Sequence, residues 1–377
     1  MKRISNSLDK TERECYHIVK KNINILFNYK KQDVIYMKLF KFAIPLLLFL
    51  LVSCGGSSSD LEAENEPPGN ESVIRVLVPG NERSKGFMAS GFRGFSRIKS
   101  EISNVDVGYL SDISETSEEA LSEALRKLAE DKPDLIIAVG GQNDKAAETV
   151  SKEFSDIQFV VVQGSVKGEN LSSYTVKQEQ SAYLAGALAG LLTESNVVGH
   201  LSGTTQQSGL DARGAFYHGL ISTNPEADFL TIFTGDMDNP DINKEAAKAQ
   251  IDAGADYIFT MLNDGRAGAD DAMRMNEKKV YAIGNAIDWT QEKEIYIASA
   301  VADPSVAVFT AAKDYVDGNL ESNNIKEFDL NDDMVVDLAI ENTVSENVKE
   351  EIEEIKKQIL NKNIEIDTSY TGEDFKK

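Results

Sequence analysis

The chain has 377 residues, and its 62 Asp and Glu residues outnumber its 39 Lys and Arg residues to give a formal net charge of −23. A surface of that sign repels nucleic acid and anionic lipid headgroups, which excludes both as expected partners. Its two cysteines and three histidines supply no Cys/His cluster of the kind that holds zinc, so no metal site is expected.

Residues 1–36 are interpreted as an extension upstream of the true start codon. The residues that follow, Met37-Lys38-Leu39-Phe40-Lys41, have the form of a signal-peptide start. The extension adds Cys15 and several charges but no pattern of a second domain. We therefore expect translation to begin at Met37, and residues 1–36 are left out of the fold prediction.

A signal peptide is expected over residues 37–53. Two lysines precede an apolar run of eleven residues, 42–52, and Cys54 follows after a single small residue. Eleven apolar residues are too few to span a bilayer, which needs about twenty. A small residue before a cysteine has the form of a lipobox cleavage site. The alternative, a buried core segment that happens to end in cysteine, does not explain the lysines or the length of the run.

This leader resembles that of bacterial lipoproteins. The resemblance implies cleavage before Cys54 and lipidation of that residue by diacylglycerol and an amide-linked acyl chain, because two or more chains hold a protein where one binds only reversibly. The implied location is the cell membrane or outer membrane, on the extracytoplasmic side. The mature chain would carry 29 basic and 58 acidic residues, a net charge of −29. Cys54 would be its sole cysteine, so no intramolecular disulfide is expected.

Residues 54–72 combine the lipidated cysteine with a flexible tether. Gly, Ser, Glu and Pro dominate this stretch, and it contains almost nothing apolar to bury. A segment of that composition gains too little from burial to offset the entropy of ordering. The residues that follow are enough for one large domain or two smaller ones.

From residue 73 onward, apolar strands alternate with amphipathic helices. The first block has expected strands at 73–78, 106–110, 135–139 and 159–162, and expected helices around 92–98, 117–128 and 145–154. The second block has expected strands at 197–201, 229–233, 257–261, 280–283 and 295–301, and expected helices at 180–192, 210–220, 243–253, 267–275 and 306–316. This alternation predicts parallel α/β sheets covered on both faces, and two blocks predict two lobes with a cleft between them.

Seven small polar loops follow predicted strands, and ligands of open α/β sheets bind outside the carboxyl ends of the strands. The loops are rich in Gln, Asn and Asp, which offer donors and acceptors and suit a neutral hydroxylated or heterocyclic solute. Any one loop could simply be a turn, but seven at the same end of their strands favour a binding cleft. They are 79–82, 140–144, 163–165, 203–206, 234–238, 262–265 and 284–289.

Three parts of the chain resemble the basic membrane protein family, which includes purine-nucleoside-binding lipoproteins of ABC importers. Residues 170–190, NLSSYTVKQEQSAYLAGALAG, look like the family's crossover strand and following helix. Residues 249–259 resemble its "AQ…GAD.IF" helix and strand. Residues 85–87 and 281–284 match its first loop and a later strand. Together the resemblance covers about residues 73–325.

The resemblance implies an α/β type I periplasmic-binding-protein fold, with two Rossmann-like lobes joined by a hinge. Lobe 1 is expected to comprise residues 73–176 plus about 302–325. Lobe 2 is expected to comprise residues 177–301 plus about 326–365. In this family the ligand is trapped between the lobes when the hinge closes.

The loops and the resemblance together give ten candidate ligand contacts. Phe87 and Trp289 offer flat aromatic faces for stacking. Phe87, Asn263, Asp264 and Trp289 are expected to face one solute when the lobes close. The full set is Asn81, Phe87, Gln142, Asn143, Gln163, Met237, Asn263, Asp264, Asn285 and Trp289.

Five positions depart from the family's pattern. Pro79 and Met88 replace an Asp and an Asn of the first loop, and Met237 stands where a second stacking Phe is usual. Ala286 stands at the position of a ribose-binding Asp, and Ala302 at that of a downstream Lys. A lost carboxylate removes charge-assisted bonds worth roughly 1.5–3 kcal/mol each. Nucleosides are therefore expected to bind weakly or not at all.

Other residues favour structural interpretations. Asp236, Asp238 and Asp241 alternate as in a calcium loop, but the expected Gly and Glu are missing, and a solvated helix N-terminus is favoured. No nucleophile elbow or phosphate loop is present, so no catalytic residues are expected. Core packing is expected for Tyr183 and Phe216, and structural roles for His200 and His218.

These features predict an extracytoplasmic solute-binding lipoprotein of an ABC transporter that captures a small polar solute, nucleoside-like or other. The expected partners are the solute, the membrane through the lipid anchor, and the permease subunits. The protein is expected to be a monomer without a cofactor. The alternative is a surface or sensor lipoprotein on the same fold that is not engaged in transport.

Overall fold

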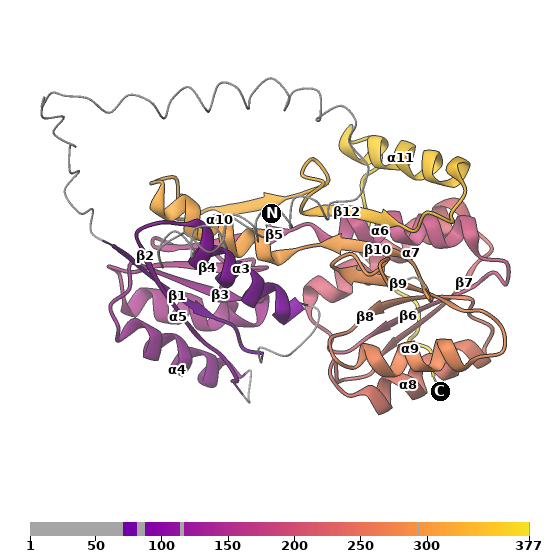
Figure 1. Ribbon diagram of the computed structural model, residues 1–377, viewed down its shortest axis with the longest axis horizontal. Coiled ribbons are helices and arrows are strands. Elements are labelled where there is room, and N and C mark those ends of the chain that lie inside the picture. Colours follow the sequence, from indigo (N-terminus) through magenta and orange to yellow (C-terminus); the bar gives the residue numbers. More distant parts are fainter. Residues whose placement is uncertain (1–70, 81–86, 114–116, 293, 377) are drawn as a thin grey trace, which may run out of the picture. The chain divides into compact units, whose positions relative to one another are not determined.

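Two six-stranded sheets form the framework of the protein (Figure 1). The computed structural model describes residues 71–80, 87–113, 117–292 and 294–376, which belong to one compact unit. In order across the first sheet the strands are β11 (Ile325–Phe328), β5 (Leu171–Val176), β4 (Gln158–Val162), β3 (Leu135–Val139), β1 (Ser72–Leu77) and β2 (Val105–Leu110). Across the second they are β12 (Val336–Ile340), β10 (Tyr296–Ala302), β9 (Tyr281–Ala286), β8 (Tyr257–Met261), β6 (Val197–Ser202) and β7 (Asp228–Phe233).

Neighbouring strands are parallel except for β12, which runs antiparallel to β10. Helices cover both faces of each sheet. The first sheet lies between the pair α4 (Glu118–Ala129) and α5 (Asp144–Glu153) and the pair α3 (Phe87–Glu101) and α10 (Pro304–Val316). The second lies between the pair α8 (Pro240–Asp252) and α9 (Arg266–Met275) and the group α6 (Gln178–Leu192), α7 (Gln207–Thr223) and α11 (Glu346–Leu360). Each sheet with its helices is called a lobe, and the predicted α/β fold with two parallel-sheet lobes is confirmed.

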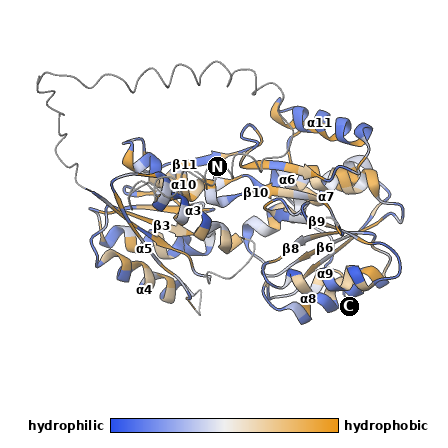
Figure 2. Cartoon of the chain, in the orientation of Figure 1, coloured by the Kyte–Doolittle hydropathy of each residue, from blue (hydrophilic) through white to orange (hydrophobic). Residues whose placement is uncertain are grey.

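The central strands are buried on both faces, as their continuous apolar runs predict. Residues 135, 137 and 139 of β3 pack towards α3 and α10, whereas residues 136 and 138 pack towards α4 and α5. All five are at most 2% exposed. Figure 2 shows hydrophobic strands between helices whose outer faces are hydrophilic. A strand enclosed in this way can present polar functional groups only at its ends.

Glycines allow α6 and α7 to pack closely. A Cβ added at Gly186 of α6 would lie 1.9 Å from the carbonyl oxygen of Phe216 in α7. One added at Gly219 would lie 2.0 Å from the carbonyl oxygen of Tyr183. Tyr183 and Phe216 are buried, as predicted, and Phe216 stacks on Phe259 with 4.7 Å between ring centroids. The Ala/Gly-rich segment therefore encodes a tight contact between two helices of the second lobe.

The chain passes between the lobes after β5, after β10 and after β11. The backbone N–H of Lys177, in the first connection, donates to the carbonyl of Phe328, where the third begins (2.8 Å). The N–H of Asp303, in the second connection, donates to the carbonyl of Val335, where the third ends (2.9 Å). Backbone hydrogen bonds therefore tie the three connections to one another.

The C-terminal part contains elements that the alternation does not reveal. No element is predicted beyond residue 316, yet β11, β12 and α11 follow. β11 pairs with β5, so residues 325–328 belong to the first sheet, although residues from 326 onward are assigned to the second lobe in the sequence-based division. β11 has a single buried side chain, Phe328, and both new strands lie at sheet edges. Short edge strands with few buried side chains leave little apolar signal.

Residues 361–376 pack along the second lobe. The ring of Tyr370 meets that of Tyr217 in α7 edge-on, with 5.0 Å between centroids. The backbone N–H of Phe375 donates to the carbonyl of Thr231 in β7 (2.7 Å). The C-terminal segment is therefore bound to α7 and to the outermost strand of the second sheet.

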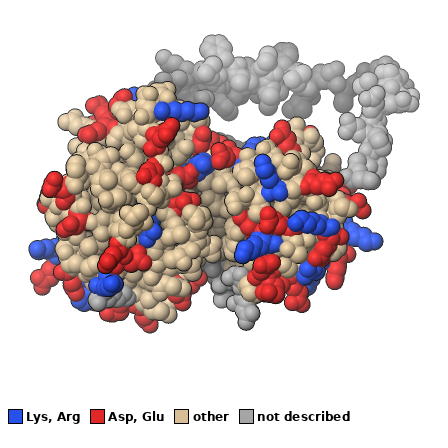
Figure 3. All heavy atoms as spheres, turned by 180° about the vertical axis from the view of Figure 1, so that it is seen from behind, with Lys and Arg blue, Asp and Glu red and all other residues tan. Residues whose placement is uncertain are grey.

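The surface is acidic with basic side chains between the carboxylates (Figure 3). Among the described residues, no helix is long and apolar enough to cross a membrane. The predicted signal peptide, Cys54 and residues 1–36 lie outside the described residues. β1 begins at Ser72, the last residue assigned to the tether.

Candidate ligand-binding site

A cavity of about 540 Å³ is lined by residues that follow the strands of both sheets. That volume is in the range of small-molecule sites, roughly 300–1,000 Å³. Each of the seven polar loops contributes at least one lining residue. The first lobe supplies Pro79, Gly80, Phe87, Met88, Asp112, Ile113, Gly140, Gly141, Gln142 and Gln163. The second lobe supplies Gln178, Ser202, Thr204, Gln206, Ser208, Gly209, Gly235, Asp236, Met237, Asp238, Met261, Asn263 and Asn285.

The first lobe gives the cavity mostly apolar and backbone surface. Phe87 and Met88 begin α3, and Pro79 and Gly80 follow β1. Phe87 is half-buried on the cavity wall, and an aromatic ring is a group that stacks on flat ligands and attracts cationic ones. Asp112, with a φ of 59°, is the carboxylate that the first lobe adds to the lining.

The turn after β3 is built around Gly140. Its φ of 105° is open to glycine and not to other residues. The turn leads into the 3-10 helix η1 (Gly141–Asn143), which places Gln142 on the cavity wall. Asn143 is buried, and its Nδ2 donates to the carbonyls of Val139 (3.0 Å) and Gly140 (2.9 Å). Asn143, predicted as a ligand contact, therefore closes the turn that presents Gln142 and does not itself line the cavity.

Gln163 lines the cavity, but the backbone holds its amide. Its Nε2 donates to the carbonyl of Val176 (2.8 Å), and its Oε1 accepts the N–H of Val176 (3.0 Å). The bridge joins the end of β4 to the end of β5, where the first connection starts. One N–H and one lone pair of this amide remain for a solute.

The loop between β7 and α8 brings two carboxylates to the second-lobe wall. Asp236 accepts the backbone N–H groups of Asp238 (2.8 Å) and Asn239 (3.1 Å). Partial burial raises the pKa of Asp238, against a backbone hydrogen bond from Asp264 that lowers it. The N-cap of α8 is Asn239, not an aspartate. Asp236 and Asp238 directly precede α8, as the interpretation of a solvated helix N-terminus expects, and both also line the cavity.

A buried arginine stands behind the second-lobe wall. Arg266 is 2% exposed, and its guanidinium donates to Oγ1 of Thr260 (2.7 Å) and the carbonyl of Leu262 (3.0 Å). It also donates to Oδ1 of Asn285, a lining residue, at 2.5 Å. Because that bond engages Asn285 Oδ1, the Nδ2 group is the end that Asn285 has free for a solute.

A tyrosine links Arg266 to a buried carboxylate. The hydroxyl of Tyr296 accepts from Arg266 (3.3 Å) and donates to Oδ1 of Asp270 (2.7 Å). Burial raises the pKa of Asp270, although the bond from Tyr296 and the charge of Arg266 lower it. Arg266 is thereby held on both sides, and it fixes the orientation of Asn285 from inside the lobe.

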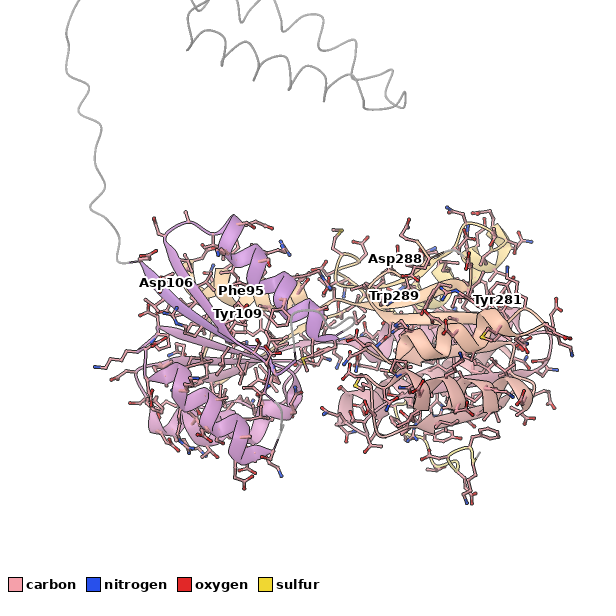
Figure 4. All side chains as sticks on the ribbon, turned by 60° about the horizontal axis from the view of Figure 1, so that its bottom comes forward. Phe95, Asp106, Tyr109, Tyr281, Asp288 and Trp289 are labelled. Carbon is pink, nitrogen blue, oxygen red and sulfur yellow. The ribbon has the colours of Figure 1, made fainter. Side chains whose placement is uncertain are left out.

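Trp289 belongs to this buried group and does not line the cavity. It is 7% exposed, and its ring stacks on Tyr296 with 5.7 Å between centroids. The guanidinium carbon of Arg266 lies 4.4 Å from the ring centroid, and Trp289 Nε1 donates to the carbonyl of Asn285 (2.9 Å). Figure 4 shows Trp289 in the second lobe beside Asp288. Trp289, predicted as a solute contact, therefore lies behind the cavity wall, where its indole supports Asn285.

The remaining candidates divide between the cavity and other places. Asp264 is half-buried beside the wall and does not line it, and its backbone N–H donates to Oδ1 of Asp238 (3.3 Å). Of the four residues predicted to face one solute, Phe87 and Asn263 line the cavity, whereas Asp264 and Trp289 do not. Asn81 lies outside the described residues. The candidates that line the cavity are Phe87, Gln142, Gln163, Met237, Asn263 and Asn285.

Some lining residues have no counterpart among the candidates. Asp112 and Ile113 follow β2, whose loop is not one of the seven. Gln178 and Gln206 come from the starts of α6 and α7. Their position in the chain could have identified these residues. Each lies directly after the end of a strand or at the start of the helix that follows a strand.

The departures from the family's pattern occupy different surroundings. Pro79, Met88 and Met237 line the cavity. Ala286 and Ala302 are 6% and 5% exposed and do not line it. The carboxylate and ammonium that the resemblance implies at those two positions are replaced by buried methyl groups.

The two described histidines lie away from the cavity lining. His200 is fully buried with its Nδ1 2.9 Å from Oγ1 of Thr231, and burial lowers its pKa to about 3. His218 places Nε2 2.9 Å from the carbonyl oxygen of Ser369. In the part of the chain that the structure describes, no group of three or more His, Cys, Asp or Glu residues is placed to hold a metal ion.

Residues 71–369 match the Bmp family, described as PnrA-like ABC transporter substrate-binding proteins. The chain belongs to this family. The match covers both lobes and most of the C-terminal segment, and it confirms the resemblance drawn from residues 170–190 and 249–259. A substrate-binding role is thereby supported for the chain as a whole.

Curated relatives carry several names. A CD4+ T-cell-stimulating antigen of Listeria innocua is 25% identical over 88% of this chain and 99% of its own length. The transcriptional activator protein med of Bacillus subtilis is 23% identical over 77% of this chain and 86% of its own length. A purine-binding protein of Brucella abortus is 25% identical over 47% of this chain and 49% of its own length.

The fold is that of solved solute-binding proteins. The crystal structure of an ABC transporter solute-binding protein from Aeropyrum pernix K1 superimposes with a TM-score of 0.69 at 18% identity. It covers 80% of this chain and 94% of its own. At that identity the similarity shows the fold alone, and it agrees with the two-lobe architecture described above.

Proposed function

We propose that this protein is an extracytoplasmic, lipid-anchored substrate-binding component of an ABC importer that captures a small polar solute. The observation that carries the proposal is a single cavity of about 540 Å³ whose walls are strand ends from both lobes of a Bmp-family chain. Apolar surface with a few placed polar groups is the usual composition of small-molecule sites.

The mechanism is capture followed by closure. An open form admits the solute. The lobes then rotate towards each other about the three connections, and contacts from both lobes to the solute stabilise the closed form. The bond between Gln163 and Val176 lies where the cavity wall meets the first connection. A solute held against Gln163 would therefore be linked to the hinge. The closed form would then dock on membrane permease subunits driven by separate ATPase subunits.

The test is to identify what the protein carries. Native mass spectrometry of the purified full-length chain should show one bound small molecule that leaves on unfolding. The same molecule should be returned unchanged after prolonged incubation, because the described cavity presents no recognised nucleophile or metal motif. A folded protein that captures no small molecule from cell extract would contradict the proposal.

The anchor has its own test. Wild-type protein should partition into detergent with the membrane fraction, and Cys54→Ala should abolish acyl labelling. Equal labelling of the variant would contradict lipidation at Cys54. Labelling of Cys15 would in addition contradict translation from Met37.

Purine nucleosides are the first solutes to measure, because one relative is named a purine-binding protein. Weak or absent binding of adenosine, guanosine and inosine is expected, since Ala286 and Ala302 supply no polar groups. A sub-micromolar affinity measured by calorimetry would show that another part of the cavity replaces them.

A second candidate function is sensing without transport, which the relative named as a transcriptional activator favours. The same cavity would then control an interaction rather than delivery. Uptake of the captured solute by cells that lack the gene separates the two. Loss of uptake supports import, whereas normal uptake with altered gene expression supports sensing.

A further inference from the structure

The cavity carries negative charge from both lobes. Asp112 comes from the first lobe, and Asp236 and Asp238 come from the second. Their hydrogen bonds come from neutral groups: the hydroxyl of Ser111 reaches Asp112 (2.9 Å), and backbone N–H groups reach the other two. Among the described residues, none of the lining side chains is Lys, Arg or His, and none of the three carboxylates forms an ion pair.

Asn263 adds an acceptor that lacks a partner. This residue lines the cavity and is 7% exposed. Its Oδ1 is buried and has no hydrogen-bond partner in the described part of the chain. Buried polar atoms are nearly always hydrogen-bonded. A solute that donates a hydrogen bond would give this buried acceptor the partner that it lacks.

Two features argue against a cationic solute, helix N-termini at the cavity and the hydroxyls of a neutral ligand, but both are weaker than the charge of the three carboxylates. The first turns of α3, α6 and α7 reach the cavity, and a helix N-terminus carries about half a positive charge that fades beyond its first turn. Three such ends do not balance three full negative charges. The hydroxyls of a neutral sugar could donate to the carboxylates. The negative charges of the three carboxylates would then repel one another without a compensating positive charge as the cleft closes and loses water.

We propose that the solute is an organic cation, a protonated amine on an apolar body. This inference rests on the proposed function of solute capture. The ammonium group donates to Asp236, Asp238 and Oδ1 of Asn263, while Asp112 closes over it from the opposite lobe. The apolar body contacts Phe87, Met237 and neighbouring methionines, and the ring of Phe87 adds a cation–π attraction.

The charge also controls closure. When the cavity is empty, Asp112 on one lobe and Asp236 with Asp238 on the other repel each other as the lobes approach. A bound cation replaces this repulsion with attraction on both sides. The solute that favours closure is therefore one that neutralises these three carboxylates, which repel an anion.

The experiment begins with full-length protein freed of solute and incubated with a deproteinised extract of the producing cells. Native mass spectrometry then identifies the retained molecule, which should be positively charged at pH 7. Tryptamine, tryptophol and indole-3-acetate serve as probes because they share a ring system and differ in charge. Tryptamine should bind at least about tenfold more tightly than tryptophol, and indole-3-acetate least tightly.

Substitutions assign the effect to the carboxylates. Asp112→Asn and the double variant Asp236→Asn with Asp238→Asn should each weaken tryptamine binding about tenfold or more and leave tryptophol binding unchanged. Asn adopts the positive φ of residue 112 readily, so the first variant should keep its melting temperature. The matched control is Asp241→Asn, at the start of α8 and outside the lining, which should change neither affinity.

Each outcome decides between the two proposals. A captured solute that is neutral or anionic overturns the cation proposal and leaves solute capture standing. Tryptamine that binds no more tightly than tryptophol overturns it too, as does full tryptamine affinity in the folded Asn variants. Arg83 and Lys85 lie outside the described residues. A double variant, Arg83→Gln with Lys85→Gln, that loses affinity for the captured solute would indicate an anionic solute instead. Capture of nothing at all contradicts the proposed function itself.

Discussion

The two lobes share a strand order but build their cavity walls differently. The first lobe presents glycine backbone, the start of α3 and a single carboxylate, Asp112. The second presents two carboxylates, Asn263 and Asn285, and Arg266 fixes Asn285 from behind. The first wall therefore provides mainly backbone and apolar contact surface, and the second provides mainly polar side chains held in fixed orientations.

This difference assigns separate tasks to the lobes. Buried hydrogen-bond networks hold side chains in one orientation, which gives specificity to the groups that reach a ligand. The second lobe should therefore select the solute, while the first lobe supplies contact area on closure. Figure 4 shows the packing of the first lobe at Phe95 and Tyr109, which lie side by side away from the cavity lining, with 4.8 Å between ring centroids.

The largest effect is expected from a substitution that disturbs the packing of α6 on α7 in the second lobe. Gly186→Leu places a side chain where a Cβ alone would meet the carbonyl of Phe216. We expect a loss of about 3 kcal/mol or more in the free energy of unfolding, measured in urea. Gly168→Ala is the control, because its Cβ would meet only ordinary contacts at 3.5 Å. A Gly186→Leu protein as stable as wild type would mean that α6 and α7 can separate freely.

Arg266→Met tests whether the second wall is oriented from behind. The substitution removes the donor to Thr260, Leu262 and Asn285, and we expect unfolding to become easier by about 2–3 kcal/mol. Affinity for the captured solute should also fall, although Arg266 does not line the cavity. The exposed Arg274→Met, whose ion pairs lie at the surface, should cost less than about 1 kcal/mol and leave affinity unchanged. Unchanged affinity in a folded Arg266→Met protein would contradict the orienting role.

Acid should weaken the second lobe through His200. Burial lowers the pKa of His200 to about 3, whereas an unfolded histidine titrates near 6.5. Between these values the unfolded chain binds a proton that the folded chain does not, so stability is lost as pH falls below about 6.5. We expect about 2 kcal/mol of loss between pH 7 and pH 5 from this residue. Urea unfolding at both pH values should show a smaller loss in His200→Leu and the wild-type loss in His218→Gln.

The smallest expected effect concerns the first wall. Phe87→Ala removes a stacking face worth about 0.5–1.5 kcal/mol plus buried area, so affinity for the captured solute should fall about tenfold. Phe95→Ala is the matched control on the same helix, half-buried and outside the lining. It should lower the melting temperature and leave affinity alone. Equal affinity in Phe87→Ala and wild type, measured by calorimetry, would remove Phe87 from the site.

The fold follows from the sequence where strands are buried on both faces. The run 135–139 predicts β3 because every residue of it is apolar, and the same pattern finds most of the parallel strands. β11 is missed because it lies at an edge with only Phe328 buried. For the same reason the predicted boundary between the lobes, at about residue 325, precedes the observed one, which follows β11.

The site is predictable down to its loops but not to its side chains. Parallel strands must bring their carboxyl ends to one edge, so the seven loops could be assigned from the alternation alone. Whether a side chain turns outward depends on partners distant in sequence. Trp289 turns inward because Arg266 and Tyr296 meet it there. Asp236 and Asp238 suit a helix start and a cavity wall equally well by sequence.

The C-terminal segment has a consequence for solubility. β7 is the outer strand of the second sheet, and an open strand edge is a template on which other chains assemble. The bond from Phe375 to Thr231 and the ring of Tyr370 occupy part of that edge. A protein shortened after residue 362 would keep its cavity but expose the edge. Its aggregation should therefore rise with concentration while solute binding per folded molecule stays the same.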